Sequence, residues 1–319
     1  MRRAAGVSTV AAAALATLTL SAFAEGAGSK TAVRAGNGLI AYVHNSQIWT
    51  ANSDGSNQRQ LTFGGEGDEF NAWPAWSPDG AKIAFLSEGT RGISTMNPDG
   101  TDVRSLTNNF SRDVVLDGPT WSPDGRIAFM ESTPGPSGPT TNVIVMNGDG
   151  SDPHAIPAPA LLTGELHWSP DGRSFIFVSA LRKRGIYVMR SDGTRVQRLT
   201  IAAGGTRMWP DSDTEPSWSP DGTKIAFTRI QRRHGTFCFR IFIVHRDGSG
   251  PHQRRSDCPL PDSEPEWSPD GTKILFSTYR PLGPHGRNQL AWTTTNGRNV
   301  HLFPVGIYGI DADWQPVSP

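Results

Sequence analysis

One five-residue motif, Trp-Ser-Pro-Asp-Gly, dominates this sequence and recurs five times. It occupies residues 76–80, 121–125, 168–172, 218–222 and 267–271, so that its copies are 45 to 50 residues apart. A sixth tryptophan, Trp314, follows at the same spacing within Asp-Trp-Gln-Pro and lacks the Asp-Gly pair. Self-similarity at this period indicates a chain built from repeated structural units that stack on one another.

Each unit contains the same series of short apolar runs. An alternating run follows the motif, as in Lys82 to Phe85, and a second run follows a loop of variable length, as in Ile186 to Met189. A third short run ends in Leu-Thr or a similar pair, as at Leu199-Thr200. Runs of four to six residues rich in β-branched and aromatic side chains, bounded by turn residues, are strands. Together with the segment that carries the tryptophan, each unit has four.

Two kinds of tight turn separate these strands. In Ser-Pro-Asp-Gly, proline presets the backbone angle at the second position of a type I turn, and glycine accepts the left-handed angle that closes it. A second turn, Asp-Gly or Asn-Gly, is closed in six places by Gly55, Gly100, Gly150, Gly193, Gly248 and Gly297. Such a pair between alternating apolar runs is a strong hairpin signal, so each unit should be an antiparallel sheet.

The number of turns determines how the two ends of the repeat must meet. The first unit, from Gly38 to Thr62, has three strands and no leading tryptophan strand, whereas the segment ending at Trp314 is a tryptophan strand with no unit after it. A four-stranded sheet cannot bury both faces alone, but a closed ring of sheets buries each against its neighbour. We therefore expect an all-β, six-bladed β-propeller of four-stranded antiparallel blades over residues 37–317, closed by a C-terminal strand that completes the N-terminal blade.

The repeated tryptophans are expected to be structural, because packing requires the same side chain at the same place in every unit. A buried tryptophan removes about 150–250 Å² from water, an upper bound of about 4–6 kcal/mol each. The alternative is that they stack on a cofactor or a sugar. The six residues are Trp76, Trp121, Trp168, Trp218, Trp267 and Trp314.

The repeat, with Pro-x-Trp-Ser-Pro-Asp-Gly, Ile-Ala-Phe, Tyr-Val-Met and Leu-Thr, resembles the WD-like propeller repeat of the C-terminal domain of TolB proteins. The same repeat type occurs in tricorn-type proteases and in the propellers of prolyl-oligopeptidase-like enzymes. The resemblance covers about residues 37–317 and implies a propeller that binds protein partners in the bacterial envelope. TolB proteins carry an α/β domain before the propeller, where this sequence has only residues 25–35. One fold hosts many functions, so the resemblance specifies the fold more strongly than the function.

The N-terminus has the pattern of a secretory signal peptide. Arg2 and Arg3 precede an Ala/Leu/Val-rich stretch, and Ala22-Phe23-Ala24 fits a cleavage site. We expect a cleaved signal over residues 1–24, a flexible segment over 25–36, and a secreted or periplasmic protein; a retained membrane anchor is the alternative.

Lys plus Arg and Asp plus Glu number 30 each, so removing the two arginines leaves a formal charge of −2. No global field attracts this chain to nucleic acid, and the mature chain has no spanning segment.

Searches for catalytic chemistry find no motif. The sequence has no Gly-x-Ser-x-Gly, phosphate-binding glycine loop, His-Glu-x-x-His or Cys-x-x-Cys, so no cofactor is predicted. The eight histidines do not recur at one position of the repeat; His167, beside Trp168, is expected to be a loop residue near the channel.

Acidic residues recur three positions before the tryptophans. That position is Trp73, Gly118, Glu165, Glu215, Glu264 and Asp311 in successive units, and further acids nearby are Asp213, Asp262, Glu266 and Asp313. Because the tryptophan strands converge on the axis, we expect these acids around one mouth of the channel. The functional hypothesis is a site for a cation or a basic peptide segment. The alternative is that they cap local turns and contact bulk water.

The same face is expected to carry the loops between second and third strands. Three of these loops, on successive blades, are basic: Arg182, Lys183 and Arg184 in one, Arg232, Arg233 and His234 in the next, and Arg280, His285 and Arg287 in the third. They form either a basic arc for an acidic partner or ordinary solvated loops. Both patches favour this loop-rich face as the binding face.

Cys238 and Cys258 lie equally far from Gly248, the centre of a predicted hairpin. They should therefore be opposite each other on adjacent strands, and in an exported protein we predict a disulfide between them. Two unpaired buried thiols are the alternative, because a register slip of one residue would turn them to opposite faces.

The sequence as a whole predicts an exported, non-enzymatic propeller that binds a protein, peptide or glycan through its loop-rich face. Two other functions stay open: a metal-assisted polysaccharide lyase or hydrolase acting at the channel mouth, and a structural protein of the cell envelope. The enzyme requires metal ligands that converge with a base, of which the acidic arc supplies only a part.

Overall fold

The computed structural model describes the repeat region of the chain. It covers residues 36–317 except 65–69, 88, 108–113, 137, 160–161, 180–183, 203–210, 234–235, 254–260, 281–286, 298 and 305–309. Every regular element within these ranges is a β-strand. No helix long and apolar enough to cross a membrane occurs in them.

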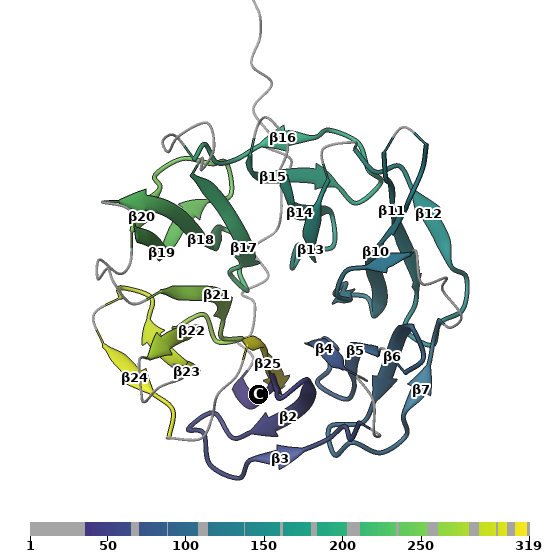
Figure 1. Ribbon diagram of the computed structural model, residues 1–319, viewed down its shortest axis with the longest axis horizontal. Helices are drawn as coiled ribbons and strands as arrows, with labels where there is room; N and C mark the ends of the chain where they lie inside the picture. The colour runs from purple at the N-terminus through teal and green to yellow at the C-terminus, as the bar shows by residue number, and fades with distance from the viewer. Residues whose placement is uncertain are drawn as a thin grey trace, which may run out of the picture. The chain divides into compact units, whose positions relative to one another are not determined.

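Six antiparallel sheets are arranged in a ring, each with its tryptophan strand nearest the centre (Figure 1). From the centre outward, the first blade is β25 (Ile310–Val317), β1 (Gly36–His44), β2 (Gln47–Ala51) and β3 (Arg59–Gln60). The second is β4 (Asn71–Trp76), β5 (Ile83–Ser87), β6 (Gly92–Met96) and β7 (Arg104–Ser105). The third is β8 (Val115–Leu116) and β9 (Thr120–Trp121), both paired with β10 (Arg126–Thr133), then β11 (Thr140–Asn147) and β12 (His154–Ile156).

The fourth blade is β13 (Gly164–Trp168), β14 (Ser174–Ser179), β15 (Gly185–Arg190) and β16 (Gln197–Arg198). The fifth is β17 (Ser212–Trp218), β18 (Lys224–Arg233), β19 (Thr236–His245) and β20 (His252–Gln253). The sixth is β21 (Asp262–Trp267), β22 (Lys273–Arg280), β23 (Arg287–Thr294) and β24 (Val300–Leu302). The predicted six blades of four antiparallel strands are confirmed, with the inner strand of the third blade divided at Asp117-Gly118-Pro119.

The two ends of the repeat close the ring as the sequence predicted. Strand β25 pairs antiparallel with β1, with Trp314 opposite Ile40 and Asp313 opposite Ala41. In Figure 1 the yellow C-terminal strand lies beside the purple N-terminal strands. Gln315 links β25 to β1 and to the second blade, because its side chain accepts the Leu39 backbone N–H and donates to the carbonyl of Gly80.

The apolar core lies between neighbouring blades rather than inside any one sheet. One cluster joins Ala41 and Ile48 of the first blade to Trp76, Ile83 and Phe85 of the second. The remaining clusters join other adjacent pairs in the same way, which is why no blade could fold alone. Of the six repeated tryptophans, five are 2–7% exposed and Trp121 is half-buried.

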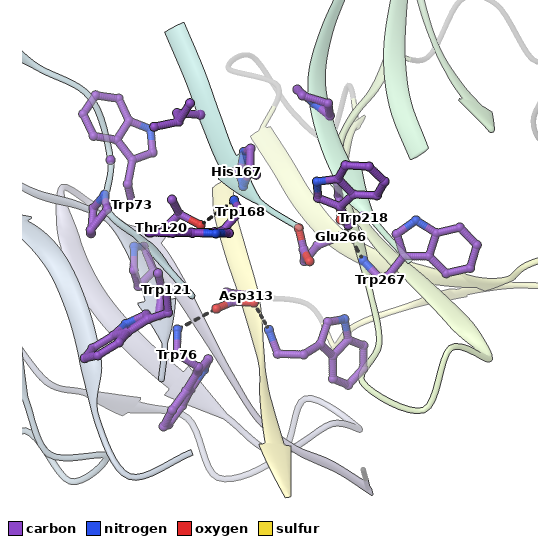
Figure 2. A pocket seen from close by; sticks show the side chains of 18 of the residues that line it. Trp73, Trp76, Thr120, Trp121, His167, Trp168, Trp218, Glu266, Trp267 and Asp313 are labelled. Carbon is purple, nitrogen blue, oxygen red and sulfur yellow. Dashed lines mark hydrogen bonds between the residues drawn. The ribbon is translucent and has the colours of Figure 1, made fainter. Parts of the chain in front are cut away.

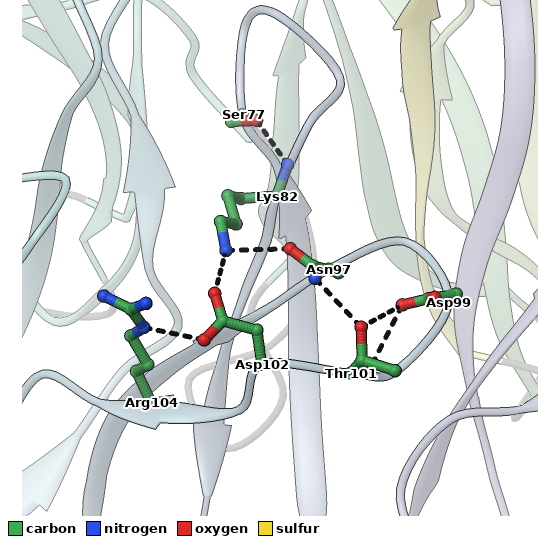
Figure 3. Close-up of polar contacts among 7 residues, drawn as sticks. All are labelled: Ser77, Lys82, Asn97, Asp99, Thr101, Asp102 and Arg104. Carbon is green, nitrogen blue, oxygen red and sulfur yellow. Dashed lines mark hydrogen bonds and ion pairs between the residues drawn. The ribbon is translucent and has the colours of Figure 1, made fainter.

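The turns contain the side-chain bonds that their composition suggests. In the second blade (Figure 3), Ser77 Oγ accepts the backbone N–H of Lys82, which closes the Ser-Pro-Asp-Gly turn. In the next turn Thr101 donates to Asp99, and Lys82 reaches Asp102 with 2.7 Å between Nζ and Oδ2. These bonds hold the pKa of Asp99 and Asp102 below the usual range. Asp99 and Asp102 therefore have a structural role in this turn.

Of the two cysteines, Cys238 is buried on β19, where it is opposite Gln231 of β18. Cys258 lies outside the described residues. The disulfide stays a prediction.

Candidate functional site

A cavity of about 610 Å³ lies in the middle of the ring and is lined by all six tryptophan strands. The wall of the cavity is formed by residues that lie from about three positions before each repeated tryptophan to two positions after it. Equivalent residues of the six blades therefore form successive rings along the cavity. The wall contains seven carboxyl groups and one histidine, and no lysine or arginine among the described residues. A low-dielectric cavity lined by one sign of charge attracts cations.

The mouth ring is formed by the residues at or next to the third position before each tryptophan: Trp73, Asp117, Glu165, Glu215, Glu264 and Asp311. The backbone is in the left-handed region at five of these positions, with φ of 50° to 57° at Trp73, Glu165, Glu215, Glu264 and Asp311. A slip in strand register occurs at the same place in the second, fourth, fifth and sixth blades. A non-glycine residue in this region costs about 1–3 kcal/mol, and such residues cluster at functional sites.

This strained conformation lets each carboxylate bond to the next blade. Glu165 accepts the backbone N–H of Glu215, Glu215 accepts that of Glu264, and Glu264 accepts that of Asp311. The N···O distances in the last two bonds are 2.7 and 2.8 Å. Asp117 of the third blade binds the backbone N–H of Glu165 in the same way. The acids therefore form a chain of blade-to-blade hydrogen bonds, which neither sequence hypothesis foresaw.

An aromatic residue completes the mouth ring. The side chain of Trp73 hydrogen-bonds to the Asp311 carboxylate of the preceding blade. On its other side it packs over Gly118, where an added Cβ would lie 2.6 Å from Trp73 Cβ. Glycine at 118 therefore makes room for the indole, and the acid of that blade is displaced by one residue to Asp117.

Burial and mutual repulsion keep protons on the mouth ring. Burial raises the pKa of Glu165 to about 7 and that of Glu264 to about 8, with further increases from Glu215 and from Asp311. Burial likewise raises the pKa of Asp311 to about 7. Glu215 and Glu264 use Oε2 in their bonds to neighbouring residues, and Oε1 of each remains accessible with no partner among the described residues. These oxygens can accept from a ligand in the cavity.

The inner ring, one residue before each tryptophan, consists of Ala75, Thr120, His167, Ser217, Glu266 and Asp313. It also joins blades: Asp313 Oδ2 accepts the Trp76 backbone N–H at 2.6 Å, and Thr120 Oγ1 accepts that of Trp168 at 3.1 Å (Figure 2). Burial raises the pKa of Asp313 to about 7 and that of Glu266 well above its usual value. Repulsion from the Asp313 carboxyl adds to the increase in the pKa of Glu266.

His167 is a strand residue rather than the loop residue that the sequence suggested. It lies on β13 and lines the cavity, where it is part of the inner ring (Figure 2). Burial lowers its pKa to about 4, so the imidazole is neutral at physiological pH. Its ring makes no hydrogen bond with any described residue, and its accessible surface faces the cavity.

Two of the acids proposed from sequence lie away from the cavity wall. Asp213 is fully buried in an ion pair with Arg229, with 2.6 Å between Oδ1 and Nε, and Asp262 is 2% exposed within its blade. Strand alternation and the register slip turn these side chains into the sheet while Glu215 and Glu264 face the channel. The other six acids, Glu165, Glu215, Glu264, Glu266, Asp311 and Asp313, all line the cavity.

The basic loops are only partly described. Arg182, Lys183, His234 and His285 lie outside the described residues, and so do the side chains of Arg233, Arg280 and Arg287. Arg184 precedes β15. Arg232 is exposed near the end of β18, with its guanidinium 5.9 Å from the Phe237 ring centroid. The basic arc stays a prediction.

Sequence reasoning missed several residues that shape the site. Asp117 was overlooked because it is four residues before its tryptophan, whereas the other acids are three residues before theirs. A carboxylate so close to the tryptophan of its repeat could have indicated it. At the opposite end of the cavity the motif prolines form a ring: Pro78, Pro123, Pro170, Pro220, Pro269 and Pro316. The cavity is therefore acidic at one end and apolar at the other. Within the described ranges, no three His, Cys, Asp or Glu side chains are placed to hold a metal ion together.

Comparison with known proteins supports the fold. No model of a protein family matches the sequence, and no curated protein matches it. Among solved structures, TolB from Acinetobacter baumannii is similar with a TM-score of 0.70 and 23% identity, over 88% of this chain and 67% of that one. The putative TolB from Agrobacterium tumefaciens has a TM-score of 0.58 and 23% identity, over 88% and 99% of the chains. An oligogalacturonate lyase from Vibrio parahaemolyticus has a TM-score of 0.57 and 14% identity, over 80% and 70%. The chain therefore has a TolB-like β-propeller fold.

Proposed function

We propose that this protein is an exported, non-enzymatic propeller that binds a protein partner by receiving a basic segment of it at the acidic mouth ring. The observation that carries the proposal is the ring itself. Carboxyl groups from five blades are gathered at one end of a cavity whose described wall has no lysine or arginine to neutralise them. A ligand with N–H donors and positive charge would relieve the repulsion among them.

The accessible Oε1 atoms of Glu215 and Glu264 give such a ligand its acceptors, while Oε2 of each is occupied in joining blades. Lysine and arginine side chains supply charged donors of the required kind, and charge-assisted hydrogen bonds are about twice as strong as neutral ones. The resemblance of the repeat to TolB propellers supports a protein rather than a glycan as the partner. A signal peptide over residues 1–24 would place the protein outside the cytoplasm.

A direct test measures binding of tetralysine to the purified protein by calorimetry, with oligogalacturonate as the glycan probe. We expect tetralysine to bind and its affinity to fall steeply with added salt, because the attraction is electrostatic. Glu215→Gln and Glu264→Gln each preserve side-chain shape and the backbone bond, so both should weaken binding without unfolding the protein. Glu131→Gln on β10, outside the cavity, is the matched control and should bind as the unchanged protein does.

Failure of tetralysine to bind would overturn the proposal. Binding of oligogalacturonate instead, or release of an unsaturated product when manganese is added, would favour the lyase function. Sequencing the N-terminus of protein recovered from the native envelope tests export separately: the expected first residue is Glu25, and an intact residue 1 would contradict it.

A further inference from the structure

The inner ring contains two carboxyl groups, of Glu266 and Asp313, that are not part of the proposed mouth site. Glu266 of the sixth blade and Asp313 of the first blade are neighbours around the ring, and each raises the energy of charging the other. Both line the cavity, and Figure 2 shows the two carboxyls close to its middle. Hydrogen bonds to Ser217 and Trp267 on one side, and to Trp76 and Trp314 on the other, fix their positions.

His167 gives independent evidence that something binds at this level. Its blade, the fourth, is opposite the first in the ring, so the imidazole is across the cavity from Asp313. His167 lines the cavity and makes no hydrogen bond with any described residue. A neutral imidazole offers one acceptor nitrogen to a ligand.

The two rings are separated by a stretch of wall without charge. Glu264 and Glu266 are two residues apart on β21, as are Asp311 and Asp313 on β25. A regular strand rises about 3.3 Å per residue, so the two rings are at most roughly 6–7 Å apart. The residues between them are Pro74, Pro119, Leu166, Pro216, Pro265 and Ala312. A ligand that reaches from one ring to the other must therefore be apolar in the middle and cationic at its inner end.

We propose that the inner ring is a subsite for the ammonium group of one lysine side chain, which enters from the partner segment bound at the mouth. The inference rests on the function proposed above. A lysine has a flexible four-carbon stem of about 6 Å and a compact head with three donors. The stem would pass the apolar stretch, and the head would bind Glu266 and Asp313, with His167 as a further acceptor.

A peptide series that varies one side-chain length tests this. The probes are acetyl-Arg-Gly-X-Gly-Arg-amide, in which X is lysine, ornithine, diaminobutyrate or norleucine, so that all share two arginines for the mouth ring. We expect the lysine peptide to bind at least about ten-fold more tightly than the diaminobutyrate peptide, whose ammonium stops two carbons short. The norleucine peptide, which has the stem without the charge, should bind like the diaminobutyrate peptide.

Glu266→Gln should remove the preference for the lysine peptide and leave the affinity for the diaminobutyrate peptide unchanged. The unchanged affinity would also show that the mouth ring is intact. His167→Asn is the second variant should Glu266→Gln not fold, and it should reduce the preference in the same direction. Glu131→Gln is the control and should keep the full preference. In the unchanged protein, the imidazole NMR signals of His167 should shift with the lysine peptide and not with the diaminobutyrate peptide.

Equal affinity of the four peptides, within about two-fold, would overturn the inner subsite while leaving the mouth function in place. Absence of binding by every peptide would overturn the mouth function and this inference together. The two failures are therefore distinguishable. An unchanged lysine preference in both the Glu266 and the His167 variants would also reject the subsite.

Discussion

The carboxylate of Asp313 accepts the backbone N–H of Trp76, with 2.6 Å between Oδ2 and N, although the two residues are 237 positions apart in the chain. This bond connects the last strand of the chain to the second blade. The same carboxylate also accepts the N–H of Trp314 at 2.8 Å. Closure of the ring therefore depends on packing and on a polar bond in the channel wall, and the residues that close it are also candidates for binding.

Trp314 should be among the most important residues for stability. It is 2% exposed and packs between the first and sixth blades with Leu275 and Phe303. Trp314→Ala should lower the free energy of unfolding by about 3–5 kcal/mol, from lost burial and the cavity left behind. Urea unfolding followed by tryptophan fluorescence measures this. Phe63→Ala, at a side chain 75% exposed, is the control, and its effect should stay within about 0.5 kcal/mol. Similar losses for both would contradict the closure by β25.

Gly118→Ala should disturb the mouth ring specifically. An added Cβ would lie 2.6 Å from Trp73 Cβ, a distance at which the tryptophan must move. We expect a loss of about 1–3 kcal/mol and a changed fluorescence spectrum. Gly164→Ala is the matched control, because its Cβ would meet only Asp117 Oδ2 at 3.5 Å, an ordinary contact. A harmless Gly118→Ala with unchanged fluorescence would show that Trp73 does not pack there.

The stability of the protein should fall as the pH rises from about 5 to about 8. The pKa values of Glu165, Asp311 and Asp313 are raised to about 7 and that of Glu264 to about 8, mainly by burial, so the folded protein keeps protons that the unfolded chain has already released. Where the folded state binds more protons, stability falls with increasing pH. The other groups facing them are Asp117, Glu215 and Glu266, whose pKa values are also raised, and His167.

Two other effects limit stability on the acid side. The pKa of His167 is lowered to about 4, so the unfolded chain gains its proton first and stability falls as the pH drops from about 6.5 to about 4. The pKa values of turn aspartates such as Asp99 and Asp149 are lowered by hydrogen bonds, and their contribution is lost below about pH 4. Because several carboxyls oppose the single histidine, urea midpoints measured from pH 4 to pH 8.5 should be highest near pH 4–5 and fall toward pH 8.5. Glu264→Gln should flatten the decline above the peak, whereas a midpoint that increases up to pH 8 would refute the assignment.

A disulfide between Cys238 and Cys258 is expected in protein purified without reductant. Mass spectrometry of the intact and alkylated chain decides it, since two free thiols would each take up the label. A bridge closing a loop of this size is worth about 3 kcal/mol in the chain-entropy model. Cys258→Ser should therefore lower the unfolding midpoint under oxidising conditions and have little effect in reductant.

Several features of the channel are predictable from individual residues of the sequence. The repeated tryptophans locate the innermost strands. The sequence places four acids near the start of these strands, and all four line the cavity: Glu165, Glu215, Glu264 and Asp311. Asp213 and Asp262 were wrongly grouped with them, because a register slip reverses which residues face the channel. Asp117 was missed for a different reason: Gly118 occupies the third position before Trp121, where the acid was sought, and the acid lies one residue earlier.

The amino-acid sequence alone determined the fold, the number of blades and the strand that closes the ring, because turn chemistry and apolar alternation are local and recur at a fixed period. Only the tertiary structure decided what the acids do. Their hydrogen bonds to the next blade join residues about 45 to 50 positions apart and occur where the backbone is left-handed. The imidazole of His167, which has no partner among the described residues, lines the same cavity as acids from other blades. Such relationships depend on how six sheets approach one axis, and no local sequence pattern specifies that approach.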